Sequence, residues 1–270
     1  MFFVNLIKYF FLGLIQGFTE PIPVSSSGHL RIFKEILNDK IFNDLSLEIF
    51  LNFGSLIAIV IFFRKDIIKI VNDFFMFIKS KEIKYKDGFK YALLIAVGTL
   101  PAAITGLLLN DFIEDVLGNV KYVGIALLIT SLFLFIIKDF KGRKKDEEIT
   151  YKDALIVGLF QAIALFPGIS RSGATLVGAM LLGIKRKSAF KFSFMLYIPI
   201  SLATMVLGIK NFITSDISGE IIVYYLVGMI AAFFMTAIST KWFSKIIKQG
   251  KLIYFVIYCI IMGLSVILFL

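Results

Sequence analysis

The chain has 270 residues, of which 59% are apolar and 18% are charged, and its mean hydropathy is +0.89. Soluble domains are about 45–50% apolar and about 25% charged, so this composition excludes an ordinary cytosolic enzyme, a disordered protein and a secreted disulfide scaffold. With Cys259 as its single cysteine, the chain can form no internal disulfide. We interpret the formal net charge of +10 as lysines at a membrane surface, and nucleic acid is not expected as a partner.

The first apolar stretch, residues 2–37, is interrupted. It breaks at Pro21-Ile22-Pro23 and runs into Ser25-Ser26-Ser27-Gly28. A second stretch, residues 154–184, is interrupted in the same way before Ser170-Arg171-Ser172-Gly173. Because proline and glycine end helices, neither stretch is one clean membrane span. We expect each of them to form a re-entrant helical hairpin.

Six further apolar stretches each approach the ~17–25 residues that a membrane-spanning helix needs. They cover residues 47–63, 91–110, 121–137, 192–210, 221–240 and 252–270. The predicted fold class is therefore an all-α polytopic membrane protein, with six transmembrane helices and two re-entrant helical hairpins.

The basic residues set the predicted orientation. Of the 29 lysines and arginines, 22 lie in four loops, 64–90, 138–153, 185–191 and 241–251. One lysine each, beside two or three acids, is found in the loops 38–48, 110–121 and 210–220. By the positive-inside rule the first four loops are cytoplasmic. The first hairpin then opens to the outer side and the second to the cytoplasm.

A shift of 145 residues aligns the two interrupted stretches without a gap. Gly13-Leu14-Ile15-Gln16 falls on Gly158-Leu159-Phe160-Gln161, and the serines and glycine of the two Ser-x-Ser-Gly motifs coincide. Each half, residues 1–137 and 154–270, is then one hairpin followed by three spans within a single integral membrane domain. Because each half crosses the membrane an odd number of times, this is an inverted-topology repeat, whose broken helices are expected to meet near the midplane.

Ionisable groups inside membrane segments are costly and usually functional. This chain has Glu20, His29 and Arg31 in the first hairpin and Arg171 in the second. Gln16 and Glu20 share one helix face. Arg31 is expected at the mouth of the hairpin, and His29, the only histidine, is a candidate general base or acid.

Two half-helix N-termini, the Arg171 guanidinium and a cluster of hydroxyls together predict a pocket for a phosphate-bearing anion. Glu20 would repel that anion unless a divalent cation, Mg²⁺ or Ca²⁺, lay between them. The other candidate pocket residues surround the two helix breaks: Gln16, Thr19, Ser25, Ser26, Ser27, Gly28, Ser170, Ser172, Gly173 and Thr175.

The segments Gln16-Gly17-Phe18-Thr19-Glu20-Pro21-Ile22-Pro23-Val24-Ser25-Ser26-Ser27-Gly28-His29-Leu30 and Pro167-Gly168-Ile169-Ser170-Arg171-Ser172-Gly173-Ala174-Thr175 resemble the two signatures of the bacterial undecaprenyl-diphosphatases, also called bacitracin-resistance proteins. Lys191-Phe192-Ser193-Phe194, with Pro199, resembles a further segment of that family. The resemblance covers the whole chain in length, span number and position of both signatures.

The resemblance implies hydrolysis of undecaprenyl diphosphate to undecaprenyl phosphate and phosphate, which recycles the lipid carrier for cell-wall synthesis. It implies a divalent cation and a site open to the outer face of the bacterial plasma membrane. Carried over, Glu20 is the acidic motif residue and metal ligand, Ser26 and His29 are the catalytic pair, and Arg171 clamps the phosphate. The substrate and membrane lipid are the implied partners, and a homodimer is left open.

Two residues depart from the family pattern. Gln16 stands where some members have a second glutamate, which argues against a metal site with two carboxylates from this helix. Pro21 replaces an aromatic or aliphatic residue, and we expect it to shift the helix break.

Two mechanisms and one rival function stay open. In the favoured mechanism Ser26 attacks the terminal phosphorus and His29 takes its proton; in the other, His29 attacks or activates water. The rival function is transport of a prenyl phosphate or a small anion, because inverted repeats with broken helices also build transporters. A membrane phosphatase of the phosphatidic-acid type is disfavoured, since its chemistry uses two histidines and this chain has one.

Overall fold

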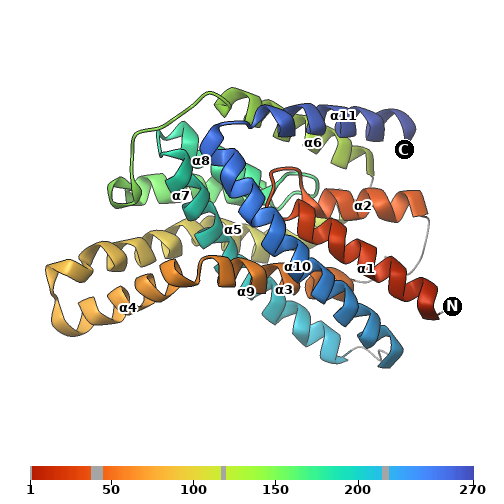
Figure 1. Ribbon diagram of the computed structural model, residues 1–270, viewed down its shortest axis with the longest axis horizontal. Helices are drawn as coiled ribbons and strands as arrows, with labels where there is room; N and C mark the ends of the chain where they lie inside the picture. Colours follow the sequence, from red (N-terminus) through yellow and green to blue (C-terminus); the bar gives the residue numbers. More distant parts are fainter. Residues whose placement is uncertain (1, 38–44, 117–119, 215–218) are drawn as a thin grey trace.

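The computed structural model describes residues 2–37, 45–116, 120–214 and 219–270, and these are helical throughout apart from turns and loops (Figure 1). In chain order the α-helices are α1 (Phe2–Thr19), α2 (Ser26–Leu37), α3 (Leu45–Phe62), α4 (Arg64–Ser80), α5 (Lys86–Val116), α6 (Val120–Ile137), α7 (Tyr151–Ile163), α8 (Arg171–Leu181), α9 (Arg186–Thr214), α10 (Gly219–Gln249) and α11 (Ile253–Phe269). Two short 3₁₀ helices, η2 (Ile83–Tyr85) and η3 (Asp146–Glu148), lie in the connections. The all-α prediction is confirmed.

Five helices of the described residues, α1, α5, α6, α9 and α10, are long and apolar enough to cross a membrane. Four of them match predicted spans, and α1 belongs to the predicted first hairpin. The predicted span 47–63 passes the same criterion only when α3 is joined to α4 across a bend of 74°, and α11 is slightly short at 17 residues. The predicted outer loops 38–48, 110–121 and 210–220 lie outside the described residues only at 38–44, 117–119 and 215–218. Elsewhere in these ranges α3, α5, α6, α9 and α10 extend further than predicted.

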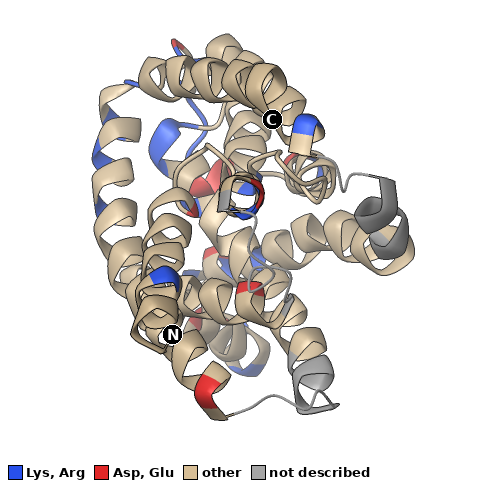
Figure 2. Ribbon diagram, turned by 90° about the vertical axis from the view of Figure 1, so that its right-hand side faces the viewer, with Lys and Arg blue, Asp and Glu red and all other residues tan. Residues whose placement is uncertain are grey.

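Charged residues are sparse within the apolar windows of the five long helices, as a lipid environment requires. Figure 2 looks onto the end of the molecule that carries both termini, and most of the ribbon there bears neither acid nor base. The helix α4 and the connection between α6 and α7 project at the opposite end (Figure 1). The predicted topology likewise puts both termini on one side.

Residues 64–90 were expected to be a loop, and this expectation is wrong. They fold as α4 and η2, followed by the first turn of α5. The apolar face of α4 packs on α5, with the rings of Phe74 and Phe77 centred 5.3 and 4.8 Å from that of Phe89. The number of basic residues predicts that such a segment lies outside the membrane. It says nothing about whether the apolar residues recur with the period of a helix, as they do in α4.

Both interrupted stretches form a helix, a break and a second helix, as predicted. The pairs are α1 with α2 and α7 with α8, and the members of each pair pack on each other. The Ser25 hydroxyl accepts a hydrogen bond from the Gly28 N–H at 3.2 Å, and the Ser170 hydroxyl accepts one from the Gly173 N–H at 3.1 Å. Each second helix is therefore capped at its N-terminus by the serine that precedes it. How deeply the hairpins enter a membrane stays a prediction.

The two halves pack reciprocally. α1 lies along α10 and α7 lies along α5. A Cβ on Gly13 would be 2.1 Å from the Gly228 carbonyl oxygen, and a Cβ on Gly158 would be 2.4 Å from that of Gly98. Both helix pairs thus approach through two glycines, because no larger residue leaves room for the neighbouring backbone.

Residues at the 145-residue offset also meet each other directly. The Tyr197 hydroxyl donates to Asn52 Oδ1 at 2.7 Å, and these two residues are 145 positions apart. Two residues at equivalent positions of the two halves can contact each other only where both lie next to the two-fold axis that relates the halves. The pairing of the helices and this contact are consistent with an internal two-fold repeat, which stays a prediction together with its inverted orientation and its division at residues 137 and 154.

The glycine contacts predict a large effect of a single methyl group. In Gly13→Ala the new Cβ must push α1 away from α10, and we expect a loss of about 1–3 kcal/mol in stability, measured as unfolding in detergent. Gly219→Ala is the matched control, because a Cβ there meets nothing within 4 Å in the described part of the chain. Equal stabilities of the two variants would contradict the close approach.

Candidate active site

The two helix breaks touch each other. The Ser172 hydroxyl donates to the Ile22 carbonyl oxygen at 3.2 Å. A Cβ on Gly28 would lie 3.3 Å from Gly168 Cα, and a Cβ on Gly173 would lie 3.1 Å from Pro23 Cβ. The first half-turn of α2 and that of α8 are therefore brought together, as the sequence predicts for the tips of the two hairpins.

The first hairpin contributes a carboxylate that is shared by two donors. The Gln16 side-chain amide donates to Glu20 Oε2 at 2.8 Å, and the Ser26 hydroxyl donates to the same oxygen. Gln16 reaches Glu20 from one helical turn earlier, whereas Ser26 reaches it across the break. The break at Pro21-Ile22-Pro23 thus folds the chain back so that the first residue of α2 faces the end of α1.

The second hairpin contributes Arg171, the first residue of α8. Its Nη1 donates to the Ser201 hydroxyl at 3.2 Å, and its guanidinium lies over the Tyr197 ring, 5.5 Å from the centroid. Arg171 Nε is buried and has no hydrogen-bond partner among the described residues. An arginine in such surroundings retains donors for an incoming anion.

Glu20 and Arg171 line the same small cavity, together with Ser172, Thr175, Ser193, Phe194 and Tyr197. Its volume of about 10 Å³ has room for about one water molecule. A diphosphate therefore enters only after side chains around Arg171 move apart. The Ser193 hydroxyl also lines the cavity, is buried and has no hydrogen-bond partner in the described part of the chain. It is therefore a further donor for a bound anion.

His29 lies one helical turn after Ser26 on α2, but its ring nitrogens contact other groups. The ring contacts the Ser25 carbonyl oxygen through Nδ1 at 2.8 Å and the Tyr258 hydroxyl through Nε2. Because a carbonyl oxygen only accepts, Nδ1 carries the proton of the neutral ring and Nε2 accepts from Tyr258. The structure does not join the predicted pair of Ser26 and His29 by a hydrogen bond, because both ring nitrogens are engaged elsewhere.

The remaining predicted site residues divide into two groups. Ser172 and Thr175 line the cavity with Glu20 and Arg171. The others serve the backbone around the breaks. Thr19 donates to the carbonyl oxygen four residues earlier at 2.7 Å, Ser25 and Ser170 cap α2 and α8, and Ser27 contacts the Ser25 hydroxyl at 3.4 Å.

The 145-residue offset places Ser26 and Arg171 at equivalent positions, each first in its half-helix. Glu20 has no equivalent carboxylate, because Leu165 stands there. Gln161, the equivalent of Gln16, is fully buried with neither amide atom hydrogen-bonded among the described residues. The first hairpin therefore contributes the hydroxyl and the carboxylate, and the second contributes the guanidinium.

Residues of the site that sequence reasoning missed come from α3, α9 and α11: Asn52, Ser193, Tyr197, Ser201 and Tyr258. Applying the offset to Asn52 leads to Tyr197, so this pair could have been found. Nothing in the spacing of residues indicates that Tyr258 meets His29.

No group of three metal-ligating His, Cys, Asp or Glu side chains occurs in the described residues. The groups that contact Glu20 are neutral, the Gln16 amide nitrogen and the Ser26 hydroxyl, and each of these two side chains carries one neutral oxygen. One carboxylate with neutral oxygen donors fits a hard divalent cation that is completed by substrate phosphates, and does not fit a metal held by protein alone.

An apolar cavity of about 190 Å³ adjoins the first break. Thr19 and Ile22 form its wall on the side of the break, and Trp242 and Tyr258 face them from α10 and α11. The Phe18 ring stacks on Trp242 with centroids 5.8 Å apart. An apolar chain attached to a group bound near Glu20 would find this cavity next to it.

The comparisons with known proteins agree with these features. The family described as bacitracin resistance protein BacA matches residues 9–265. The chain is 46% identical over 268 residues to "Undecaprenyl-diphosphatase 2" of Bacillus thuringiensis, covering 99% of both chains. It is 44% identical over 270 residues to "Undecaprenyl-diphosphatase" of Oceanobacillus iheyensis, covering 99% and 98%, and 43% identical over 273 residues to "Undecaprenyl-diphosphatase 1" of Bacillus licheniformis, covering all of both.

The position of His29 can be tested directly, because it is the only histidine. In Tyr258→Phe the Nε2 atom loses its hydrogen-bond donor, so the ¹⁵N resonance of Nε2 in histidine-labelled protein should move. Tyr254→Phe on the same helix is the control and should leave the resonance unchanged. An unchanged Tyr258→Phe spectrum would show that the hydrogen bond to Nε2 does not form.

Proposed function

The chain belongs to the bacitracin resistance protein BacA family, and we propose that its two joined helix breaks are the active site with which it hydrolyses undecaprenyl diphosphate. The products are undecaprenyl phosphate and inorganic phosphate, and the reaction recycles the lipid carrier for cell-wall synthesis. One observation carries the assignment of the site. The Ser26 hydroxyl donates to Glu20 in the first break, and Arg171 of the second hairpin lines the same cavity as that carboxylate.

Arg171 binds the terminal phosphate in this proposal. A guanidinium matches two phosphate oxygens with parallel N–H donors, which a lysine cannot do. Its Nε is already desolvated and has no partner among the residues that the structure describes, so no such partner has to be displaced from that atom. The N–H groups that open α8 add partial positive charge where charge develops on the phosphoryl oxygens.

Ser26 is the proposed nucleophile, and Glu20 takes its proton. The serine oxygen forms a bond to the terminal phosphorus as the bond to the bridging oxygen breaks, and undecaprenyl phosphate leaves. Water then cleaves the phosphoserine and releases phosphate. The hydrogen bond from Ser26 to Glu20 supports this assignment over one in which His29 is the base.

His29 is proposed as a positioning residue for the start of α2. Its ring ties the Ser25 carbonyl oxygen to Tyr258 of α11, and Ser25 immediately precedes Ser26. Through these two contacts His29 holds Ser25, the residue before the proposed nucleophile, against α11.

A divalent cation, Mg²⁺ or Ca²⁺, is proposed as the cofactor. Glu20, Gln16 and Ser26 would hold it, and it would offset the repulsion between the Glu20 carboxylate and the substrate phosphates. Its donor set is incomplete without substrate, so the chain alone is expected to bind the cation weakly.

The site is proposed to open to the outer side of the plasma membrane, in an inverted-topology repeat of residues 1–137 and 154–270. The four predicted cytoplasmic loops support this orientation, because they gather at the end of the molecule away from the termini (Figure 1). The pairing of α1 with α10 and of α7 with α5, each through two glycines, supports the repeat.

Phosphate release from a C55 prenyl diphosphate in detergent tests the catalytic assignment. Ser26→Ala should lose about 10³-fold or more in kcat, and Glu20→Gln and Arg171→Lys about 10²–10³-fold each. Chelation of divalent cations should abolish turnover of the wild-type protein. Ser27→Ala is the matched control, since within the described ranges its hydroxyl is hydrogen-bonded only to that of Ser25.

Trapping of radiolabelled phosphate separates the two mechanisms. A phosphoenzyme present in His29→Gln but absent from Ser26→Ala supports Ser26 as nucleophile, and the reverse pattern sinks that assignment. If folded wild-type protein binds the lipid phosphate but releases no phosphate under any condition, the transporter alternative replaces the hydrolase.

The apolar cavity beside the break is proposed to hold the first isoprene units of the substrate. Trp242→Ala should raise KM for the C55 diphosphate about tenfold through lost apolar contact, while KM for a short soluble diphosphate stays unchanged. Phe234→Ala, on the lipid-exposed side of the same helix, is the control. An equal rise for both substrates would place the tail elsewhere.

A further inference from the structure

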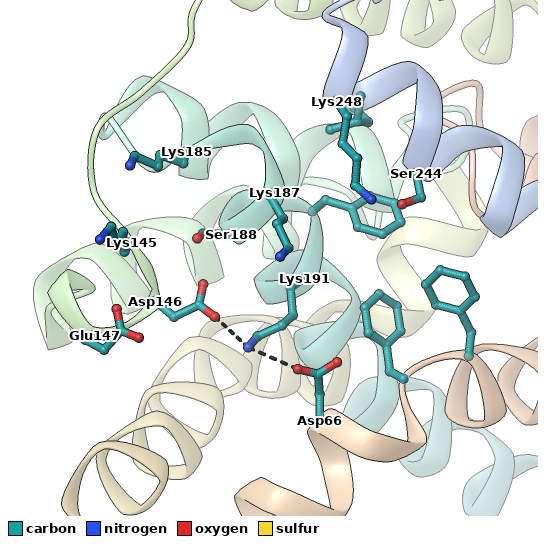
Figure 3. A pocket seen from close by; sticks show the side chains of 14 residues that line it. Asp66, Lys145, Asp146, Glu147, Lys185, Lys187, Ser188, Lys191, Ser244 and Lys248 are labelled. Atoms are coloured by element: carbon teal, nitrogen blue, oxygen red, sulfur yellow. Dashed lines mark hydrogen bonds and ion pairs between the residues drawn. The ribbon is translucent and has the colours of Figure 1, made fainter.

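A further cavity lies away from the proposed active site. It has a volume of about 550 Å³ and shares no residue with the cavity of Glu20 and Arg171. Its walls come from all four loops that the positive-inside rule assigns to the cytoplasm, represented by Asp66, Lys145, Lys187 and Lys248 (Figure 3). Segments spread over most of the chain thus converge on one hollow.

The cavity is rich in uncompensated positive charge. It is lined by five lysines and three acids, and the central lysine, Lys191, is neutralised by Asp146 at 2.5 Å and Asp66 at 3.3 Å. The other four lysines form no ion pair in the part of the chain that the structure describes: Lys145, Lys185, Lys187 and Lys248. Figure 3 shows Lys187 and Lys248 reaching into the space beside Lys191.

The start of α9 adds to this field. Lys187 and Ser188 belong to the first turn of this 29-residue helix and line the cavity, and Ser188 is buried. The first backbone N–H groups of a helix lack partners within the helix and carry partial positive charge. A lysine ammonium, a serine hydroxyl and helix N–H groups are together the donors that bind phosphate oxygens.

The floor of the cavity is apolar. Phe63, Phe190 and Ile247 are buried side chains that line it. A free inorganic anion would gain nothing from these apolar side chains. An anionic lipid can place its acyl chain against them and its charged headgroup beside the lysines. Basic pockets between membrane helices on the cytoplasmic side suit anionic headgroups for this reason.

We propose that this lysine cavity, lined by Lys145, Lys185, Lys187, Lys248 and the first turn of α9, is a second ligand site, which takes the phosphate group of an anionic membrane lipid. The bound phosphate offsets part of the net charge of +2 that five lysines and three acids give the lining, and the lipid chain covers the aromatic floor. The site is independent of catalysis, because it holds neither the Glu20 carboxylate nor the Arg171 guanidinium. The first turn of α9 lines this cavity, and Ser193 and Tyr197 of the same helix line the cavity of Glu20 and Arg171. The helix α9 therefore connects the two cavities.

Native mass spectrometry of the full chain in detergent tests the proposal with three probes: dioctanoyl phosphatidylglycerol, dioctanoyl phosphatidylcholine and inorganic phosphate. We expect wild-type protein to retain phosphatidylglycerol in preference to phosphatidylcholine. The double variant Lys187→Gln/Lys248→Gln should bind phosphatidylglycerol with an affinity lowered at least about tenfold. Lys65→Gln/Lys69→Gln removes the same charge from the exposed face of α4 and should bind like wild type.

Two further arms make the result unambiguous. Lys187→Arg/Lys248→Arg should retain binding, which separates loss of the site from loss of the fold. Glu20→Gln should also retain binding, so failure of the proposed catalytic site leaves this test unaffected. Inorganic phosphate that competes at the concentration of the lipid would support the phosphate site with free phosphate as its source. Equal retention of both lipids, or wild-type binding by the glutamine pair, would overturn the proposal.

Discussion

The dominant constraint on this protein is the cost of holding an arginine and a carboxylate among apolar helices. Neither Arg171 nor Glu20 could face lipid, because a charged group away from water needs polar partners that hydrocarbon does not supply. The chain meets this requirement by breaking two helices at the same place. Each break frees backbone N–H groups and positions serines, and the two breaks together surround the charged groups with donors and acceptors.

Close packing of the helices keeps the breaks in contact. The glycine crossings of α1 with α10 and of α7 with α5 bring backbones nearer than any side chain would allow. In a membrane, where apolar burial drives helix association little, such close approach is the main source of attraction between helices. The hydrogen bond from Tyr197 to Asn52 then joins α9 to α3 beside the site. Rigid helix pairs therefore carry a site whose own cavity admits only about one water molecule.

Much of this arrangement could be predicted from the sequence. The two helix breaks, the all-helical fold and the meeting of Ser26, Glu20 and Arg171 follow from prolines, serines and scarce charges in apolar stretches. The helical nature of residues 64–80 could not be read from a charge count. The partners of His29 could not be predicted either. Spacing along a chain shows which residues share one helix face, but Tyr258 lies 229 positions away, and only the packing of α11 decides that it meets that face.

The equivalence of Ser26 and Arg171 has a consequence for how such a pocket can be assembled. In a dimer of two identical half-length chains, the two equivalent positions would carry the same residue. Such a dimer would hold two hydroxyls with no guanidinium, or two guanidiniums with no nucleophile or carboxylate. Because the two halves are one chain, the two equivalent positions can carry different residues. A nearly symmetric scaffold can therefore hold a nucleophile on one side of the pocket and a guanidinium on the other. The long connection between α6 and α7 is thus a requirement of the chemistry as well as a link between two bundles.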